Sequence, residues 1–300
     1  MKNLEDFLRP SQKQLFKRLC KKFKGKTLIS KGNFILVHGQ APVMLVAHLD
    51  TVHEQPVKDI CFSADKNIIM SPQGIGGDDR CGCFALVKIF QSAQVKPWLL
   101  FTCEEEVGGI GAKKFCLAHK QHQLPNELAS LKFVIELDRK GSRDAVFYRC
   151  ANPDFEAYIS GKGFTTAQGS FSDISVIAPE LDIAAVNLSS GYHHAHTLHE
   201  HINRAELDST ICKVVEIISD VPQLSRFEYV ECIQSVEQPK LVRCDDSIFL
   251  PRRVSPNLLD IYKFLLDFYS VNELESFRAE YGDHILWQIY YDEIDYFYRS

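Results

Sequence analysis

The sequence has no apolar run that approaches the ~20 residues needed to span a membrane, and its N-terminus lacks the apolar core of a signal peptide. It also lacks a basic excess: the formal net charge is −5, so its charge predicts no binding to nucleic acid or to an anionic membrane surface. The ten cysteines show no disulfide-framework spacing, which indicates reduced, core-filling thiols. We therefore expect a cytoplasmic protein that binds neither nucleic acid nor a membrane.

Two common motifs are incomplete. The glycine-rich stretch GIGGDDRCG, residues 74–82, is not followed by the GK[ST] of a phosphate-binding loop, and its acids would repel phosphate. Cys81 and Cys83 form a tight CxC pair, but no second pair completes a four-sulfur metal site. Phosphate binding and a zinc–sulfur site are therefore disfavoured.

The composition is that of an ordinary globular protein, with 45% hydrophobic and 24% charged residues. Its 300 residues suit one large or two modest domains. We expect a catalytic domain over residues 1–235, which starts with an amphipathic helix within residues 1–25, and an aromatic-rich, mostly helical extension over residues 236–300. The extension is either a small appendage or an oligomerisation element, so homo-oligomerisation stays open.

Four short apolar runs, each followed by polar residues, dominate the first domain. The runs cover residues 43–47, 98–102, 133–137 and 183–188; they lead into His48 and Asp50, Glu104 to Glu106, Asp138, and a histidine tract from His193 to His201. Such runs predict buried strands, and the helical patterns between them predict crossovers. The fold class we expect is a three-layer α/β sandwich with a mixed, mainly parallel central sheet, plus a small helical C-terminal appendage.

The polar residues at the strand ends form a candidate metal site, because the chemistry of open α/β sheets lies beyond the carboxyl ends of the strands. His48 and Asp50 have the spacing of a metal-bound imidazole and a carboxylate that orients it. Asp78, one acid of the Glu104–Glu106 run, Asp138 and one histidine of the tract add further donors. Such oxygen and imidazole donors suit zinc, with cobalt or manganese as alternatives. Five positions are too many for one catalytic zinc but suffice for two ions if one carboxylate bridges them.

The order of these motifs resembles the co-catalytic di-zinc exopeptidases, a group that includes bacterial leucyl aminopeptidase and peptidase T-like zinc peptidases. HLD at 48–50, the DD pair at 78–79, EEVG at 105–108, a strand-end aspartate and HTLHE at 196–200 follow one another as in that family, and the similarity spans residues 43–205. The resemblance implies a zinc-exopeptidase fold and a metal-dependent hydrolase that acts on short peptides or acylated amino acids.

The resemblance also implies a ligand set for two divalent ions. The implied ligands are His48, Asp78, Glu106, Asp138 and His196. In the family pattern Asp78 would bridge the two ions. His48 and Asp138 would complete the first site, and Glu106 and His196 would complete the second.

The same comparison implies the catalytic residues. Glu105, the first glutamate of EEVG, would be the general base that takes a proton from the attacking water and passes it to the leaving amine. Asp50 would stand behind His48, and Glu200 of HTLHE would be a supporting carboxylate.

The sequence departs from the family pattern in three places. Arg80 follows the DD pair, where peptidase T-like members usually carry lysine. The interval between Asp138 and His196 leaves no room for the inserted lid or dimerisation domain of those members. An oxyanion donor from such a lid would be missing, and Tyr192 is a candidate substitute. The last part of the chain matches nothing in the family.

Three functions remain open at this stage. The first is an aminopeptidase; the second is a carboxypeptidase, dipeptidase or N-acyl amino acid deacylase on the same metal site. An aminopeptidase needs a carboxylate to receive the substrate amine, and the rival needs a cation to receive a free carboxylate. The candidate acids are Glu104, Asp173 and Glu200; the candidate cations are Arg139, Lys140 and Arg204. The third function is a non-catalytic binding protein on a peptidase scaffold.

Overall fold

The structure, a computed structural model, describes residues 1, 3–30, 32–53 and 55–232, and within the C-terminal part residues 261, 262, 265, 274, 275, 278, 285–287, 289 and 290. The chain divides into two compact units, Met1–Glu231 and Cys232–Ser300. The predicted boundary between residues 235 and 236 lies outside the described residues and stays a prediction.

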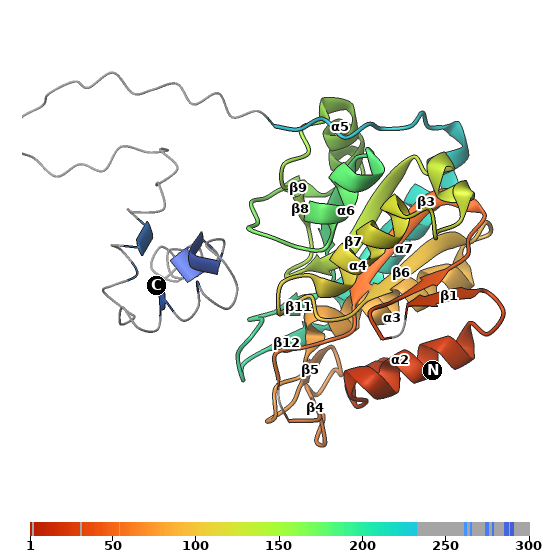
Figure 1. The fold of residues 1–300 in the computed structure, drawn as a ribbon. Helices are drawn as coiled ribbons and strands as arrows, with labels where there is room; N and C mark the ends of the chain where they lie inside the picture. Colours follow the sequence, from red (N-terminus) through yellow and green to blue (C-terminus); the bar gives the residue numbers. More distant parts are fainter. Residues whose placement is uncertain are drawn as a thin grey trace, which may run out of the picture. The chain divides into compact units, whose positions relative to one another are not determined.

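An eight-stranded mixed sheet forms the centre of the first unit (Figure 1). Its strands, in spatial order, are β1 (Thr27–Ser30), β2 (Phe34–Val37), β6 (Pro97–Thr102), β3 (Ala41–His48), β7 (Phe133–Arg139), β10 (Ala185–Ser189), β8 (Asp144–Val146) and β9 (Thr165–Thr166). The four central strands β6, β3, β7 and β10 run parallel, whereas β1 and β2 form an antiparallel edge. The four predicted strands are these four central ones, so the predicted sheet is confirmed.

Helices cover both faces of the sheet because the central strands are apolar on both. Along β3, Val43, Leu45 and Ala47 join one buried cluster, and Met44 and Val46 join the other. Helices α3 (Gly77–Ser92) and α7 (Arg204–Asp220) pack on the first face, and α4 (Ile110–Lys120) and α6 (Ile174–Leu181) pack on the second. The structure is therefore the three-layer α/β sandwich expected from the sequence.

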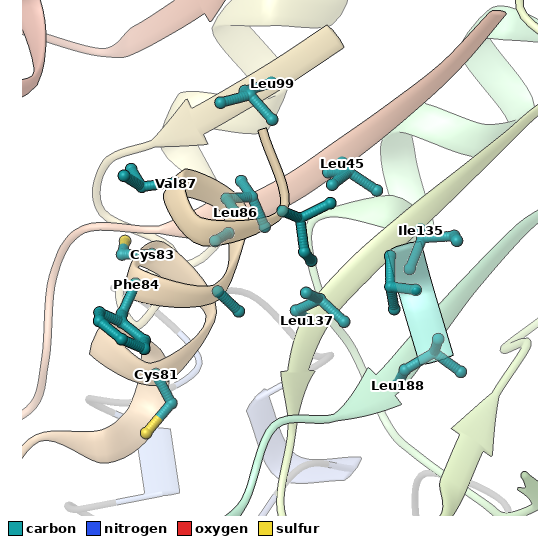
Figure 2. Packing of buried hydrophobic residues seen from close by; sticks show 14 of the residues in the cluster. Leu45, Cys81, Cys83, Phe84, Leu86, Val87, Leu99, Ile135, Leu137 and Leu188 are labelled. Atoms are coloured by element: carbon teal, nitrogen blue, oxygen red, sulfur yellow. The ribbon is translucent and has the colours of Figure 1, made fainter. Parts of the chain in front are cut away.

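Helix α3 packs closely on the central strands. Leu86 points toward the strands that carry Leu45 and Leu137 (Figure 2), whereas Phe84 packs on Phe7 of the N-terminal segment at 5.6 Å between ring centroids. Each buried Leu or Phe stabilises the fold by about 2 kcal/mol. A Cβ on Gly82 would lie 2.1 Å from the Leu137 carbonyl oxygen, so only glycine allows α3 to approach β7 this closely. The approach brings the DD pair before α3 to the ends of the strands.

The N-terminal segment contains two helices, where the sequence predicted one. Helix α1 (Glu5–Leu8) ends before Pro10, and Ser11 caps α2 (Gln12–Lys22) through a capping box with Gln14. Arg80 is buried and donates hydrogen bonds of 2.8 and 2.9 Å to the carbonyl oxygens of Phe7 and Pro10. This arginine therefore ties the N-terminal helices to α3.

A smaller antiparallel sheet lies beside the main one, in the order β11 (Tyr192–His193), β12 (His201–Asn203), β5 (Ile68–Met70) and β4 (Cys61–Phe62). Helix α7 begins directly after β12, where the Asn203 side chain accepts the backbone N–H of Glu206. Between Asp138 and His196 the chain forms β8, α5 (Pro153–Gly161), β9, α6, β10 and β11. These elements belong to the same unit, so no lid domain is inserted there.

The remaining expectations concern the C-terminal unit, membranes and cysteines. From residue 261 onward the described residues of the second unit are helical, and Ile261, Leu265, Leu274 and Leu286 are buried together. No helix among the described residues has the length and apolar character to cross a membrane.

Nine cysteines of the described chain carry free thiols, and the Cys83 thiol donates to the His48 carbonyl oxygen at 3.0 Å.

Candidate metal centre

The predicted site residues meet at the carboxyl ends of the parallel strands. His48 is the last residue of β3, Glu105 and Glu106 follow β6, and Asp138 lies at the end of β7. His196 lies in the loop between β11 and β12, and Asp78 precedes the regular part of α3, with a non-helical backbone at φ −81° and ψ 107°. Residues distant in the sequence therefore converge because their strands end at one edge of the sheet.

The buried side chain of His48 lies between three carboxylates. Its Nε2 is 3.1 Å from Asp78 Oδ1 and 3.3 Å from Asp138 Oδ1, and its Nδ1 is 3.4 Å from Asp50 Oδ1. One ring nitrogen thus faces two candidate ligands while the other faces a third carboxylate, and a carboxylate behind the ring is common at metal-bound histidines.

Asp78 connects His48 to a second histidine. Its Oδ2 is 3.3 Å from His196 Nε2, and the same nitrogen is 3.1 Å from Glu106 Oε2. The two oxygens of Asp78 therefore face different histidines. His48 also faces Asp138, and His196 also faces Glu106. Asp78 thus directs one carboxylate oxygen toward each histidine.

Asp50 and Glu200 hold the backbone around these groups. The Asp50 carboxylate accepts the N–H groups of Glu105 and Glu106, both at 3.1 Å, so it fixes the loop after β6 as well as the His48 ring. Glu200 is fully buried and accepts the N–H groups of Gly76 and Asp78, both at 2.9 Å. Both acids therefore hold the backbone that carries the candidate ligands Asp78 and Glu106.

His53 completes the Glu200 network, and sequence reasoning missed it. Its Nε2 lies 2.7 Å from Glu200 Oε2. The sequence does show a second histidine, His53, shortly after His48. Nothing in the spacing of the motifs indicated that Glu200 would be its partner. Since Glu200 holds the Asp78 backbone, His53 supports the position of Asp78 through Glu200.

The histidine tract contributes one residue to the centre. His193 Nε2 lies 2.6 Å from Glu206 Oε2, and its ring stacks on His201 at 5.1 Å between centroids. His194 in turn lies 5.4 Å from His201. The rings of His193 and His194 thus both contact His201, while His196 faces the acids.

The carboxylates at the centre strongly affect one another's ionisation. Burial alone would raise the pKa of Asp78, but hydrogen bonds from His196 and His48 hold it well below its usual range. Burial and the Asp78 charge together raise the pKa of Asp138 to about 7. Burial, reinforced by the charges of Asp138 and Asp173, raises the pKa of Glu105 well above its ordinary value despite the nearby His48. A divalent cation would offset this crowding of acids.

The donors fit a divalent metal ion. Within the described residues, His48 with Asp78 and Glu106, and His48 with Asp79 and Asp138, bring ligand atoms within 4.8 Å of one another. Asp79 is already engaged, since it accepts the N–H groups of His48 at 3.3 Å and Gly82 at 2.8 Å. Glu106 Oε1 is buried and has no hydrogen-bond partner in the described part of the chain. Such a buried oxygen needs a cation or a donor.

Two predicted substrate-site residues are engaged elsewhere. Tyr192 is buried, and its hydroxyl donates to the Asp138 carbonyl oxygen at 3.1 Å, so in this structure it is not free to stabilise an oxyanion. Asp173 is buried at the N-terminus of α6 and accepts the hydroxyl of Thr102. Its carboxylate is therefore not exposed to receive a substrate amine in this structure.

The fold is a three-layer α/β sandwich, and its centre is a cluster of histidines and carboxylates that fits a divalent metal ion. Comparison with known proteins identifies the family. Residues 35–217 match the profile of Peptidase family M28, so the chain belongs to this family and is a metallopeptidase that binds divalent metal. A search among curated proteins found no match.

Solved structures share the fold. A tripeptidase from Staphylococcus aureus matches with a TM-score of 0.56 and 16% identity, covering 74% of this chain and 98% of that chain. Aminopeptidase PepT from Bacillus cereus matches with a TM-score of 0.53 and 16% identity over 73% of this chain and 97% of that one. The TET1 peptidase of Pyrococcus horikoshii, which can assemble into a tetrahedron or a large octahedral shell, matches with a TM-score of 0.53 and 13% identity. The match covers 72% of this chain and 98% of that chain. These similarities confirm the predicted zinc-peptidase fold.

Proposed function

We propose that this metallopeptidase is an aminopeptidase that uses two divalent ions to release the N-terminal residue of short peptides. His48 and Asp138 would hold one ion, and Glu106 and His196 the other, with Asp78 between them. The observation that carries the proposal is the position of Asp78, whose Oδ1 and Oδ2 lie 3.1 and 3.3 Å from Nε2 atoms of two different histidines. Zinc suits this mixture of imidazole and carboxylate donors, and cobalt or manganese could replace it.

Glu105 is the general base in this proposal. When bound, the ions would polarise the scissile carbonyl and lower the pKa of a water molecule. Glu105 lies next to the ligand Glu106, its backbone is held by Asp50 at 3.1 Å, and it is not needed as a ligand. It can therefore accept the proton of the water and return it to the leaving amine.

The charged groups around the site favour an aminopeptidase over a carboxypeptidase or deacylase. Of the three candidate cations, Arg139 Nε lies 3.4 Å from Asp144 Oδ2 and Arg204 Nε lies 2.9 Å from Asp208 Oδ2. Lys140 also has an interaction partner, so none of the three is free to receive a substrate carboxylate in this structure. Of the acids that could receive a substrate amine, Glu200 and Asp173 are buried, whereas Glu104 is exposed in the loop after β6. We propose Glu104 as the residue that receives the amino group.

A paired substrate panel tests this function. The zinc-loaded protein is expected to hydrolyse leucyl-p-nitroanilide and free dipeptides, and to leave their N-acetylated counterparts intact, because the acetyl group removes the positive charge of the amine. Cleavage of the acetylated dipeptides alone would favour the carboxypeptidase or deacylase. Hydrolysis of neither set by protein with bound metal would indicate a non-catalytic binding protein.

A further inference from the structure

Strand β7 carries one residue more than its neighbour β10 beside Asp138. The parallel register pairs Asn187 with Glu136 and then Ser189 with Arg139. Leu137 and Asp138 therefore lie opposite the single residue Leu188, which is a β-bulge. A bulge leaves backbone groups outside the regular ladder, and bulges next to active sites commonly redirect a side chain.

The side chain of Asn187 supplies the hydrogen bonds that the bulge interrupts. Its Oδ1 accepts the N–H of Asp138 at 2.9 Å, and its Nδ2 donates to the Asp138 carbonyl oxygen at 3.2 Å. The amide thus bonds both backbone polar groups of Asp138, as a peptide group of a neighbouring strand would. Asn187 is 1% exposed, so water does not compete for these bonds.

The surroundings of Asn187 fix the orientation of its amide. Besides the Asp138 carbonyl, its Nδ2 lies 3.1 Å from the Tyr148 hydroxyl, 3.4 Å from Ser172 Oγ and 3.4 Å from Asp138 Oδ2. A flipped amide would set its NH2 against the Asp138 N–H and its oxygen against the Asp138 carbonyl and carboxylate oxygens, so the flipped orientation is excluded. Tyr192 adds a second donor to the Asp138 carbonyl at 3.1 Å.

We propose that Asn187 and Tyr192 are positioning residues that hold the bulged backbone of Asp138, and so aim its carboxylate at the ion beside His48. The inference rests on the proposed function, because it takes Asp138 as a ligand of that ion only. It has a specific consequence: loss of either residue weakens one of the two metal sites and leaves the other unchanged.

Metal titration of the metal-free protein tests this inference, with zinc as the probe and calorimetry as the readout. We expect two binding steps in the wild type. Tyr192→Phe keeps the ring and removes one hydrogen bond, so it should weaken one step by about 3–10-fold. Asn187→Leu removes both backbone contacts and should weaken the same step by about 10–100-fold, the usual effect of losing a group that orients a ligand.

Thr210→Val is the matched control. Thr210 is buried, and its hydroxyl donates to the Ser189 carbonyl oxygen at 2.9 Å, so the variant removes a buried hydrogen bond from the same strand without touching Asp138. Both binding steps should keep their wild-type affinity. A similar loss at one step in this variant would show that general disturbance of β10 is the cause, and would overturn the proposal.

Asp138→Asn separates failure of this inference from failure of the proposed function. If the wild type binds no zinc, or Asp138→Asn keeps both steps intact, the proposed metal centre is wrong. If Asp138→Asn loses one step while Tyr192→Phe and Asn187→Leu bind as the wild type does, or weaken both steps equally, the positioning role is wrong. Tyr192→Phe decides the question alone if Asn187→Leu does not fold.

Discussion

Replacing Glu105 with glutamine should lower kcat by about 10²–10⁴-fold, the range expected when a general base is removed. Glutamine has nearly the same shape but cannot accept a proton at neutral pH. Because Glu105 is not a proposed ligand, the variant should retain its bound metal. The measurement is the steady-state rate on an aminoacyl-p-nitroanilide, together with the metal content of the same sample.

Glu127→Gln provides the control for the Glu105 experiment. Glu127 is exposed in the short helical turn Asn126–Ser130, so the same chemical change there should leave both kcat and metal content unaltered. Wild-type turnover in Glu105→Gln with its metal bound would remove Glu105 from the mechanism.

Asp78→Asn should weaken both metal sites, because the two oxygens of Asp78 face His48 and His196 respectively. An amide offers a single neutral oxygen in place of two charged ones, so it cannot serve two ions. We expect each affinity to fall by more than about 100-fold, since loss of a ligand should exceed the effect of losing a supporting group. Peptidase activity should disappear at zinc concentrations that saturate the wild type.

Single-site variants make the Asp78 result interpretable. His196→Asn and Asp138→Asn should each weaken one site, as they remove a ligand of one proposed ion. Equilibrium dialysis against zinc measures all three variants. If Asp78→Asn weakened one site only, the ions would not share this carboxylate.

The sequence predicted the location of the site because its signal is local. An apolar run that ends in a histidine or an acid places that residue at the carboxyl end of a strand, and parallel strands end at a common edge. His48, Asp138 and the acids after β6 therefore came together as predicted. His196 lies in a longer loop, and its assignment needed the HTLHE resemblance.

The supporting contacts could not be predicted, because they depend on distant parts of the chain. Asn187 interrupts an apolar strand, which was a visible anomaly, but its purpose depends on a register shift against β7. Arg80 looked like a change at the metal site, whereas it bonds to Phe7 and Pro10 in the N-terminal helices. Such contacts depend on how distant segments pack in three dimensions, and the spacing of residues along the sequence does not predict them.

The number of ions bound per chain is the most direct test of the whole account. The measurement is elemental analysis of the full-length protein after saturation with zinc and removal of free metal. The proposed centre predicts two zinc ions per chain in the wild type. A stoichiometry of one or none would contradict the shared position of Asp78 on which the proposed function depends.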